Sequence, residues 1–250
     1  MTNLWGRRIL YTGASGGLGH QTTLDLLAAG AEVYAIDRDH AKNAALLADT
    51  PPDFAARLHL VEADLADQAG LETLLMGLVA DAPLDGVINN AAIYPSKPFE
   101  QYGLEEQKQV HAINVEAALI ATRAALPGMR EQGWGRVINI TSITLTGGWE
   151  NLAPYVQSKG ALLGLTRAWA REFGKWGITV NAIAPGAFPT DAEKIHPDPE
   201  GYNAMVLDRQ ALKRRGHAGD ISATIMFLMS EGAGFITGQN IAVNGGWTME

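Results

Sequence analysis

The chain has 250 residues, of which 47% are hydrophobic and 18% are charged, and its formal net charge is −8 at pH 7. This size and composition predict one globular domain with a substantial core. The acidic balance argues against a nucleic-acid-binding protein, because such proteins need a basic surface. The absence of cysteine excludes disulfides, thiol catalysis and zinc–thiolate sites.

The sequence shows no targeting or membrane-spanning segment. No stretch reaches the roughly 18 uninterrupted apolar residues that a membrane span needs. The first residues, 1–8, lack the basic segment and the long apolar segment of a signal peptide. We therefore expect a cytoplasmic protein with neither a membrane nor a nucleic acid as partner.

Short apolar, β-branched runs alternate with longer segments of helical periodicity. The predicted strands are residues 8–12, 32–36, 58–62, 86–89, 136–141, 178–183 and 240–243. The predicted helices are residues 18–29, 71–80, 104–132, 153–176 and 220–229. This alternation predicts an α/β domain with a doubly wound (Rossmann-type) parallel sheet of about seven strands and helices on both faces. No repeat or linker divides the chain, so we expect a single domain over residues 1–250.

The segment before the last predicted strand is less regular. Its helical periodicity is interrupted by prolines at positions 185, 189, 197 and 199, with one short helix predicted near residues 202–212. An insertion of this kind is more often a loop than a separate domain. We expect residues 187–217 to form a lid over a binding site.

A glycine-rich turn, Thr-Gly-Ala-Ser-Gly-Gly-Leu-Gly over residues 12–19, joins the first predicted strand to the first helix. Glycines let the backbone approach a pyrophosphate, and the helix N-terminus offers free N–H groups and a favourable dipole to the anion. The turn therefore predicts a dinucleotide site. The predicted contacts are Gly13, Ser15, Gly17, Leu18 and Gly19.

Asp37 stands at the end of the second predicted strand, eighteen residues after Gly19. In dinucleotide folds an acid at this place accepts hydrogen bonds from the adenosine ribose and repels a 2′-phosphate, which favours NAD. The alternative is that Asp37 caps a helix. Arg38 follows directly and could tolerate a 2′-phosphate, so NADP remains a second choice.

Tyr155 and Lys159 are four residues apart and share one face of the predicted helix 153–176. A neighbouring ammonium favours the phenolate, so we expect Lys159 to lower the pKa of Tyr155 from its ordinary value of about 10. Such a tyrosine can take a proton from an alcohol or give one to a carbonyl oxygen. The alternative is an exposed helical pair of no consequence.

Taken together, these motifs resemble the short-chain dehydrogenase/reductase family over essentially the whole chain. The residues that carry the resemblance are Thr12, Gly13, Gly17, Gly19, Asp37, Asp64, Leu65, the run Asn89-Asn90-Ala91-Ala92, Asn114, Ser142, Tyr155, Lys159, Pro185, Gly186 and Thr190. One departure is Ala92, where the family usually has glycine. The resemblance also implies a homotetramer, built through the predicted helices 104–132 and 153–176.

The resemblance implies a role for each residue of the site. Tyr155 is the expected general acid/base, and Lys159 is expected to bind the nicotinamide ribose. Ser142 is expected to hold the substrate oxygen, and Asn114 to hold a water that links Lys159 to solvent. The cofactor is also expected to contact Asp64, Leu65, Asn90, Ala91, Tyr155, Lys159, Pro185, Gly186 and Thr190. The residues alone leave Ser142 as a strand-end hydroxyl and Asn114 as a buried helix polar group as alternatives.

The implied activity is NAD-dependent interconversion of a secondary alcohol and a carbonyl. The predicted substrate residues are Tyr94, Thr144, Trp149, Asn151 and His196. Their mixture of aromatic and polar groups favours a small hydroxylated substrate, namely a sugar, a polyol or a sugar acid. A substrate carboxylate is expected to be reached by Arg209, Lys213 or Arg214. No metal site is predicted, because His196 has no second ligand at suitable spacing.

A dehydratase or epimerase variant, whose cofactor would show no net redox change, remains open, as do three other functions. One is an NADPH-dependent ketoreductase, and another is a dehydrogenase of aromatic secondary alcohols. The third is a non-catalytic, cofactor-sensing scaffold, since the fold alone does not determine function.

Overall fold

A computed structural model describes residues 2–249, which form one domain around a seven-stranded sheet. The strands are β1 (Arg8–Thr12), β2 (Glu32–Asp37), β3 (Leu58–Glu62), β4 (Gly86–Asn89), β5 (Gly135–Ile140), β6 (Ile178–Pro185) and β7 (Asn240–Val243). Their order in space is β3-β2-β1-β4-β5-β6-β7, and every neighbouring pair is parallel. The predicted doubly wound parallel sheet is confirmed.

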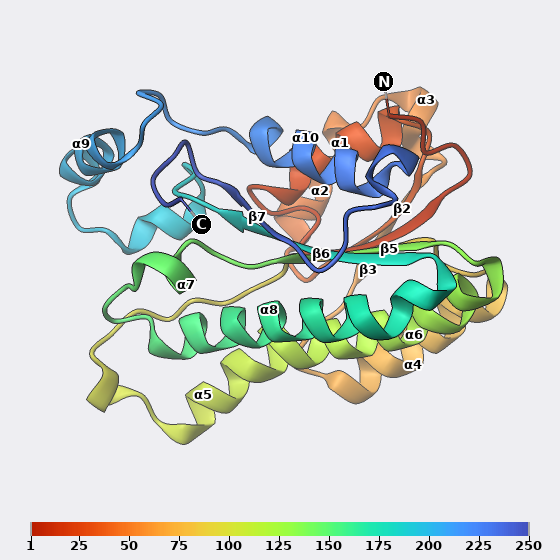
Figure 1. Cartoon of the computed structure of the whole chain (residues 1–250), viewed down its shortest axis with the longest axis horizontal. Helices are drawn as coiled ribbons and strands as arrows, with labels where there is room; N and C mark the ends of the chain where they lie inside the picture. Colours follow the sequence, from red (N-terminus) through yellow and green to blue (C-terminus); the bar gives the residue numbers. More distant parts are fainter. Residues whose placement is uncertain (1, 250) are drawn as a thin grey trace.

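Helices cover both faces of the sheet (Figure 1). The α-helices are α1 (Gly19–Ala28), α2 (His40–Asp49), α3 (Pro52–Ala55), α4 (Gln68–Asp81), α5 (Leu104–His111), α6 (Ala117–Gln132), α7 (Thr144–Gly147), α8 (Ala153–Phe173), α9 (Pro199–Arg209) and α10 (Ala218–Met229). The shorter turns are η1 (Phe99–Gln101), η2 (Ala112–Glu116), η3 (Gly174–Trp176), η4 (Asp191–Ile195) and η5 (Glu231–Ala233). Helices α1 and α10 pack on one face, and α4, α6 and α8 pack on the other (Figure 1).

The core consists of two apolar layers that the sheet separates. Successive side chains of a strand point to opposite faces. On β1, Ile9 and Tyr11 accordingly join the layer that contains Leu26 of α1, whereas Leu10 joins the layer that contains Leu75 of α4. The central strands β4, β5 and β6 are buried along their whole length, as expected for parallel strands covered on both faces.

The topology places a crevice at the carboxyl end of β1. This strand lies between β2 and β4, and Thr12 pairs with Ile36 on one side and with Asn89 on the other. The chain therefore leaves β1 toward one half of the sheet and returns for the other half from β4 onward. In open α/β sheets, ligands bind outside the carboxyl ends of the strands at such a reversal point.

The long helix predicted over residues 104–132 is divided in the structure. A π-helical turn, η2, separates α5 from α6 and carries Asn114. Such turns insert extra backbone into a helix and occur often at functional sites. Apolar periodicity continues through the turn, so it was not visible in the sequence.

Other helices also differ from the prediction: the short helices α3 and α7 were not predicted, and neither were α2 and the start of α9. Helix α2 was not predicted; it begins after Asp39, whose carboxylate accepts the N–H groups of Ala41 at 3.0 Å and Lys42 at 3.1 Å. Helix α9 begins at Pro199, before the predicted residue 202, because Asp198 caps it and proline suits the first turn.

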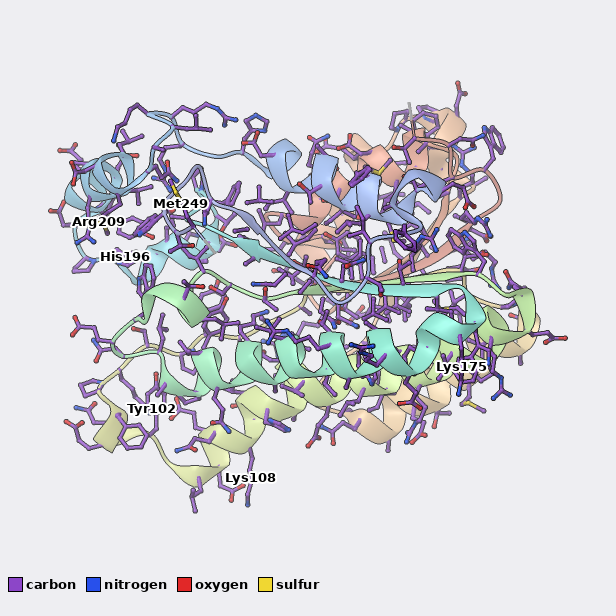
Figure 2. The ribbon with its side chains drawn as sticks, in the orientation of Figure 1. Tyr102, Lys108, Lys175, His196, Arg209 and Met249 are labelled. Atoms are coloured by element: carbon purple, nitrogen blue, oxygen red, sulfur yellow. The ribbon has the colours of Figure 1, made fainter. Side chains whose placement is uncertain are left out.

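Within residues 2–249, no helix combines the length and apolarity needed to cross a membrane. Figure 2 shows His196, Arg209 and Met249 at the same end of the molecule, whereas Lys175 lies at the opposite end. The first end is the one at which α9 and η4 lie beyond the carboxyl ends of the strands (Figure 1).

Candidate active site

A cavity of about 470 Å³ lies along the carboxyl ends of the central strands. This volume is in the range of ordinary ligand sites. The predicted cofactor and catalytic residues that line it are Gly13, Gly17, Leu18, Asp37, Asp64, Leu65, Asn90, Ala91, Ser142, Tyr155, Lys159, Pro185, Gly186 and Thr190. Residues predicted from separate motifs therefore meet in one cleft.

The glycine turn is shaped by close backbone contacts. Gly13 has a φ of +68°, which L side chains rarely adopt. A Cβ on Gly19 would lie 2.2 Å from the carbonyl oxygen of Gly13, so that position tolerates no side chain. The N-cap of helix α1, Leu18, makes no side-chain capping bond. The N–H of His20 donates to the carbonyl oxygen of Gly16 at 2.9 Å, so the remaining N–H groups of the turn and the helix dipole are what fit the pyrophosphate of a dinucleotide.

Two predicted cofactor residues lie outside the cavity lining. Gly19 shapes the turn by the close packing just described. Ser15 is buried, and its Oγ donates a hydrogen bond to Asn43 Oδ1 at 2.6 Å. Ser15 therefore ties the glycine turn to helix α2 instead of facing the cleft.

Asp37 lines the far end of the cavity, and its Oδ1 accepts the N–H of Asp39 at 3.1 Å. The alternative role as a helix cap falls to Asp39. Arg38 Nη1 lies 3.8 Å from Asp64 Oδ1, and both side chains are largely exposed. This end therefore presents an acid toward the cleft and a neighbouring arginine that is paired with another acid.

Asn90 connects the ends of β1 and β4. Its Nδ2 donates to the carbonyl oxygens of Thr12 at 3.2 Å and Gly13 at 3.0 Å, and its N–H donates to Thr12 Oγ1 at 3.1 Å. These bonds hold the glycine turn against the loop after β4. The asparagine thereby fixes the width of the cleft at its middle.

Tyr155 of α8 meets Ser142, which follows β5, inside the cavity. Burial raises the pKa of Tyr155 to about 12, although the hydrogen bond with Ser142 opposes this effect. Ser142 Oγ also accepts the N–H of Thr144 at 3.1 Å. The two hydroxyl groups are thus placed to share one substrate oxygen.

Lys159 is buried one helical turn from Tyr155. Its Nζ donates to the carbonyl oxygen of Ile140 at 2.6 Å and lies 5.5 Å from the centre of the Tyr155 ring. Burial lowers the pKa of Lys159 to about 7. The expectation that Lys159 lowers the pKa of Tyr155 is not met here, because desolvation of the phenol dominates and Lys159 is not among the groups that shift it.

Asn114 lies outside the cavity lining and is fully engaged by protein groups. Its Oδ1 accepts the N–H of Ile93 at 2.8 Å, and its Nδ2 donates to the carbonyl oxygen of Ile93 at 3.0 Å and to Ser158 Oγ at 2.9 Å. Ser158 Oγ in turn donates to the carbonyl oxygen of Tyr155 at 2.7 Å. Asn114 thereby joins η2, the loop after β4 and the first turn of α8.

Four of the five predicted substrate residues line the cavity near Tyr155: Tyr94, Thr144, Trp149 and His196. Asn151 does not. It is exposed in a turn with a φ of +62°, and its carbonyl oxygen accepts bonds from Lys97 N at 3.0 Å and Tyr102 Oη at 2.7 Å. Its role is to shape the turn before α8.

The basic residues expected to reach a substrate carboxylate are placed elsewhere. Lys213 Nζ donates to three carbonyl oxygens at the end of α9, at distances of 2.7–3.0 Å. Arg214 makes two bonds of 2.8 Å to Asp220. Neither these two residues nor Arg209 is part of the described lining of this cavity. The expectation was wrong because the chain turns away from the cleft after α9.

Several lining residues were not predicted. They are aromatic, acidic or basic side chains from the lid segment, from helix α2 and from the C-terminal segment: Lys42, Phe188, Glu193, Tyr202 and Trp247. No local motif marks them, since each reaches the cleft only through the fold. Among the described residues, no group of three or more His, Asp or Glu side chains is placed to hold a metal ion.

Comparisons with known proteins agree with this arrangement. A family model described as "Enoyl-(Acyl carrier protein) reductase" matches residues 13–248. Levodione reductase of Leifsonia aquatica is 33% identical, with 98% of this chain and 95% of that protein covered. The 2-dehydro-3-deoxy-D-gluconate 5-dehydrogenase of Bacillus subtilis is 31% identical, with 98% of this chain and 96% of that protein covered.

A solved structure extends the comparison to the fold. It is a putative NAD(P)-dependent gluconate 5-dehydrogenase from Beutenbergia cavernae with bound NADP, 32% identical, with a TM-score of 0.90 over 98% of each chain. Sequence, fold and the arrangement of Ser142, Tyr155 and Lys159 lead to the same conclusion. The chain belongs to the short-chain dehydrogenase/reductase family.

Proposed function

We propose that this protein is an NAD(H)-dependent oxidoreductase that interconverts a secondary alcohol and a carbonyl on a small hydroxylated substrate. A sugar, a polyol or a sugar acid is the favoured class. The observation that carries the proposal is the continuity of the cavity, which reaches from Asp37 past the glycine turn to Ser142 and Tyr155. One cleft can therefore hold a dinucleotide and a substrate side by side.

The hydride and the proton are handled by different groups. The bound nicotinamide would supply hydride transfer. Tyr155 takes the hydroxyl proton when the alcohol is oxidised and returns it when the carbonyl is reduced. Ser142 donates to the substrate oxygen and stabilises the negative charge that develops there. Lys159, whose Nζ lies 5.5 Å from the centre of the phenol ring, supports the proton transfer.

The choice of NAD rests on Asp37. Its carboxylate would accept hydrogen bonds from the ribose hydroxyls and repel a 2′-phosphate. Arg38 lies in an ion pair with Asp64, which leaves it less available to a phosphate. NADP is the second candidate, since a similar structure contains it. Replacement of Asp37 by Ala should narrow the difference between the kcat/KM values for NAD and NADP.

The replacement of Tyr155 by Phe tests the activity. Loss of the hydroxyl should lower kcat by at least about 100-fold, the usual contribution of general acid/base catalysis. The dissociation constant for NADH should change little, as measured by calorimetry. Turnover by Tyr155→Phe at the wild-type rate would overturn the proposal. Turnover by the wild-type protein without any net change in NADH would favour a non-redox reaction.

The proposal has three further parts. Residues 187–217, which carry η4 and α9, act as a lid over the substrate end. The protein works in the cytoplasm. It also assembles as a homotetramer through α5, α6 and α8, and the exposed apolar side chains of Leu104 and Leu119 support this. Light scattering should give four times the chain mass, and a monomer would overturn that part alone.

A further inference from the structure

The substrate end of the cavity has aromatic walls from distant parts of the chain. Trp149 and Trp247 lie with ring centres 5.5 Å apart. Tyr94 approaches Tyr155 edge-on, with ring centres 6.2 Å apart. Tyr202 of α9, which also lines the cavity, stacks on the imidazole of His196. A ring-shaped ligand beside the reactive tyrosine would thus meet flat apolar surfaces on more than one side.

These walls also carry polar groups that the protein leaves unused. No other described residue forms a hydrogen bond with Tyr94 Oη, Trp149 Nε1 or Trp247 Nε1. Thr144 Oγ1 is buried in the lining and likewise has no partner in the described part of the chain. A buried hydroxyl without a partner costs free energy, which a bonded ligand group would recover. The lining therefore combines apolar faces with several donors.

Two cations of the described lining come near this end, and neither is available to a substrate: Lys159 is expected to bind the nicotinamide ribose, and Lys42 is paired with Asp191. Beyond the tyrosines and these two lysines, the ionisable groups of the described lining at this end are Glu193 and His196. Glu193 is paired with Arg215, which does not line the cavity. Burial lowers the pKa of His196, which favours the neutral imidazole. A substrate carboxylate would be desolvated here beside Glu193 without an opposite charge, which is unfavourable.

Resting on the proposed function, we infer that the substrate is an uncharged, ring-shaped polyhydroxy compound, such as a neutral sugar ring or a cyclitol, and that sugar acids are rejected. The ring lies against Trp149 and Trp247, and its hydroxyls bond to the free donors. The hydroxyl proton of one ring carbon passes to Tyr155, and a bound nicotinamide would take the hydride from that carbon. The products are the ring ketone and the reduced cofactor.

Matched pairs of compounds test the inference. Neutral aldoses and inositols are compared with uronic acids of the same ring, with the NADH absorbance as readout and either NAD or NADP supplied. The neutral member should have a kcat/KM about 10- to 100-fold higher, the effect of one buried polar group without a partner. Faster turnover of the acid overturns the inference and leaves the proposed function intact. Turnover of aromatic secondary alcohols alone overturns both the inference and the substrate class of the proposed function, and leaves only its reaction intact.

Variants of one tryptophan provide a second readout. Trp149→Ala should raise KM for the neutral ring about tenfold, while Trp149→Phe, which retains an aromatic face, should raise it less. Calorimetric binding in the presence of cofactor should follow the same order. Trp5→Phe is the control, because Trp5 is 73% exposed and lies outside the cavity lining. Unchanged KM and affinity in Trp149→Ala would overturn the inference.

The panel of compounds also distinguishes failure of the proposed function from failure of the inference about the substrate. If a sugar, polyol or sugar acid is oxidised and Tyr155→Phe abolishes that turnover, the proposed function stands. The ratio of kcat/KM between the neutral compound and its acid then tests the inference. If no compound reduces either cofactor and no carbonyl oxidises its reduced form, the proposed function and the inference both fail.

Discussion

Lys42 Nζ lies 2.8 Å from Asp191 Oδ2, and this ion pair joins the first turn of α2 to η4 of the lid segment. Lys42 and Thr190, the residue before Asp191, both line the cavity. Hydrogen bonds from Lys194 and Lys42 lower the pKa of Asp191 to about 2. The carboxylate is therefore charged throughout the physiological range, and the contact lies next to Thr190, a predicted cofactor residue, and close enough to Tyr94 to shift its pKa.

Lys42→Met should speed the release of NADH. The pair is about half exposed, so its loss should weaken cofactor binding by no more than about fivefold, equivalent to roughly 1 kcal/mol. Added salt should also weaken cofactor binding by the wild-type protein, because it screens the ion pair, and it should affect the variant less. Stopped-flow fluorescence of NADH at low and high salt measures both effects.

Lys194→Met is the matched control. It removes a cation that contacts the same carboxylate, at 2.6 Å, but from within η4. The link between α2 and the lid segment then remains. Equal release rates in the two variants would mean that the bridge itself does not retain the cofactor.

The rate of alcohol oxidation should rise with pH. Tyr155 accepts the proton as a phenolate, and burial raises its pKa to about 12, so the active form grows continuously between pH 7 and pH 10. Carbonyl reduction uses the protonated phenol and should not gain from alkaline pH. Measurements of kcat/KM in both directions across this range check the signs. Oxidation that is fastest at pH 6 would contradict the assignment.

Lys159→Met should stabilise the fold while it abolishes activity. In the folded protein, burial lowers the pKa of Lys159 from 10.5 to about 7, so the native state disfavours the charged form. This penalty is complete below pH 7 and disappears as the pH rises through 10.5. The free energy of unfolding of the variant should exceed that of the wild type by roughly 1–3 kcal/mol at pH 6.

Denaturant melts at several pH values test this linkage. The advantage of Lys159→Met should shrink steadily between pH 7 and pH 10. Lys175→Met is the comparison, because Lys175 lies on the outside of the molecule, far from the site (Figure 2). A constant advantage of Lys159→Met over the whole range would show that burial of the charge is not its cause.

Asn114→Ala should destabilise the protein and disturb the site. The change removes three hydrogen bonds and leaves the N–H and carbonyl groups of Ile93 without their partner. The expected loss is about 1–3 kcal/mol. Ser158→Ala keeps the two bonds to Ile93 and should lose less. Thermal melts rank the variants, and equal stability of both would contradict the role assigned to Asn114.

Much of the fold could be predicted because its determinants are local. The β-branched runs of β1, β3, β4 and β7 have the predicted bounds, since short apolar segments between turns are typical of buried parallel strands. The failures have equally physical causes. Helix α2 buries little more than Asn43 and Leu46, so its apolar periodicity is weak. The π-helical turn at Asn114 leaves the apolar pattern unbroken.

The residues of the site also include some that the sequence could predict and others that it could not. The glycine turn, Asp37 and the pair Tyr155 and Lys159 could be recognised because each motif is contiguous or keeps a fixed spacing on one helix. The aromatic walls could not, because Trp149 and Trp247 are distant in the chain and meet only when the C-terminal segment folds back over α7. Asn151 and Arg214 illustrate the reverse, since polar residues near a motif can point away from it.

The sequence by itself determined the parallel sheet, the glycine turn after β1 and the spacing of the residues proposed for proton transfer, because local patterns encode them. Only the tertiary structure decided the pKa values of these groups and which side chains surround them. Burial, a property of the packed fold, raises the pKa of Tyr155 and lowers that of Lys159. Packing of residues 187–217 and of the C-terminal segment decides that aromatic side chains, among them Tyr202 and Trp247, line the cavity that also holds Tyr155.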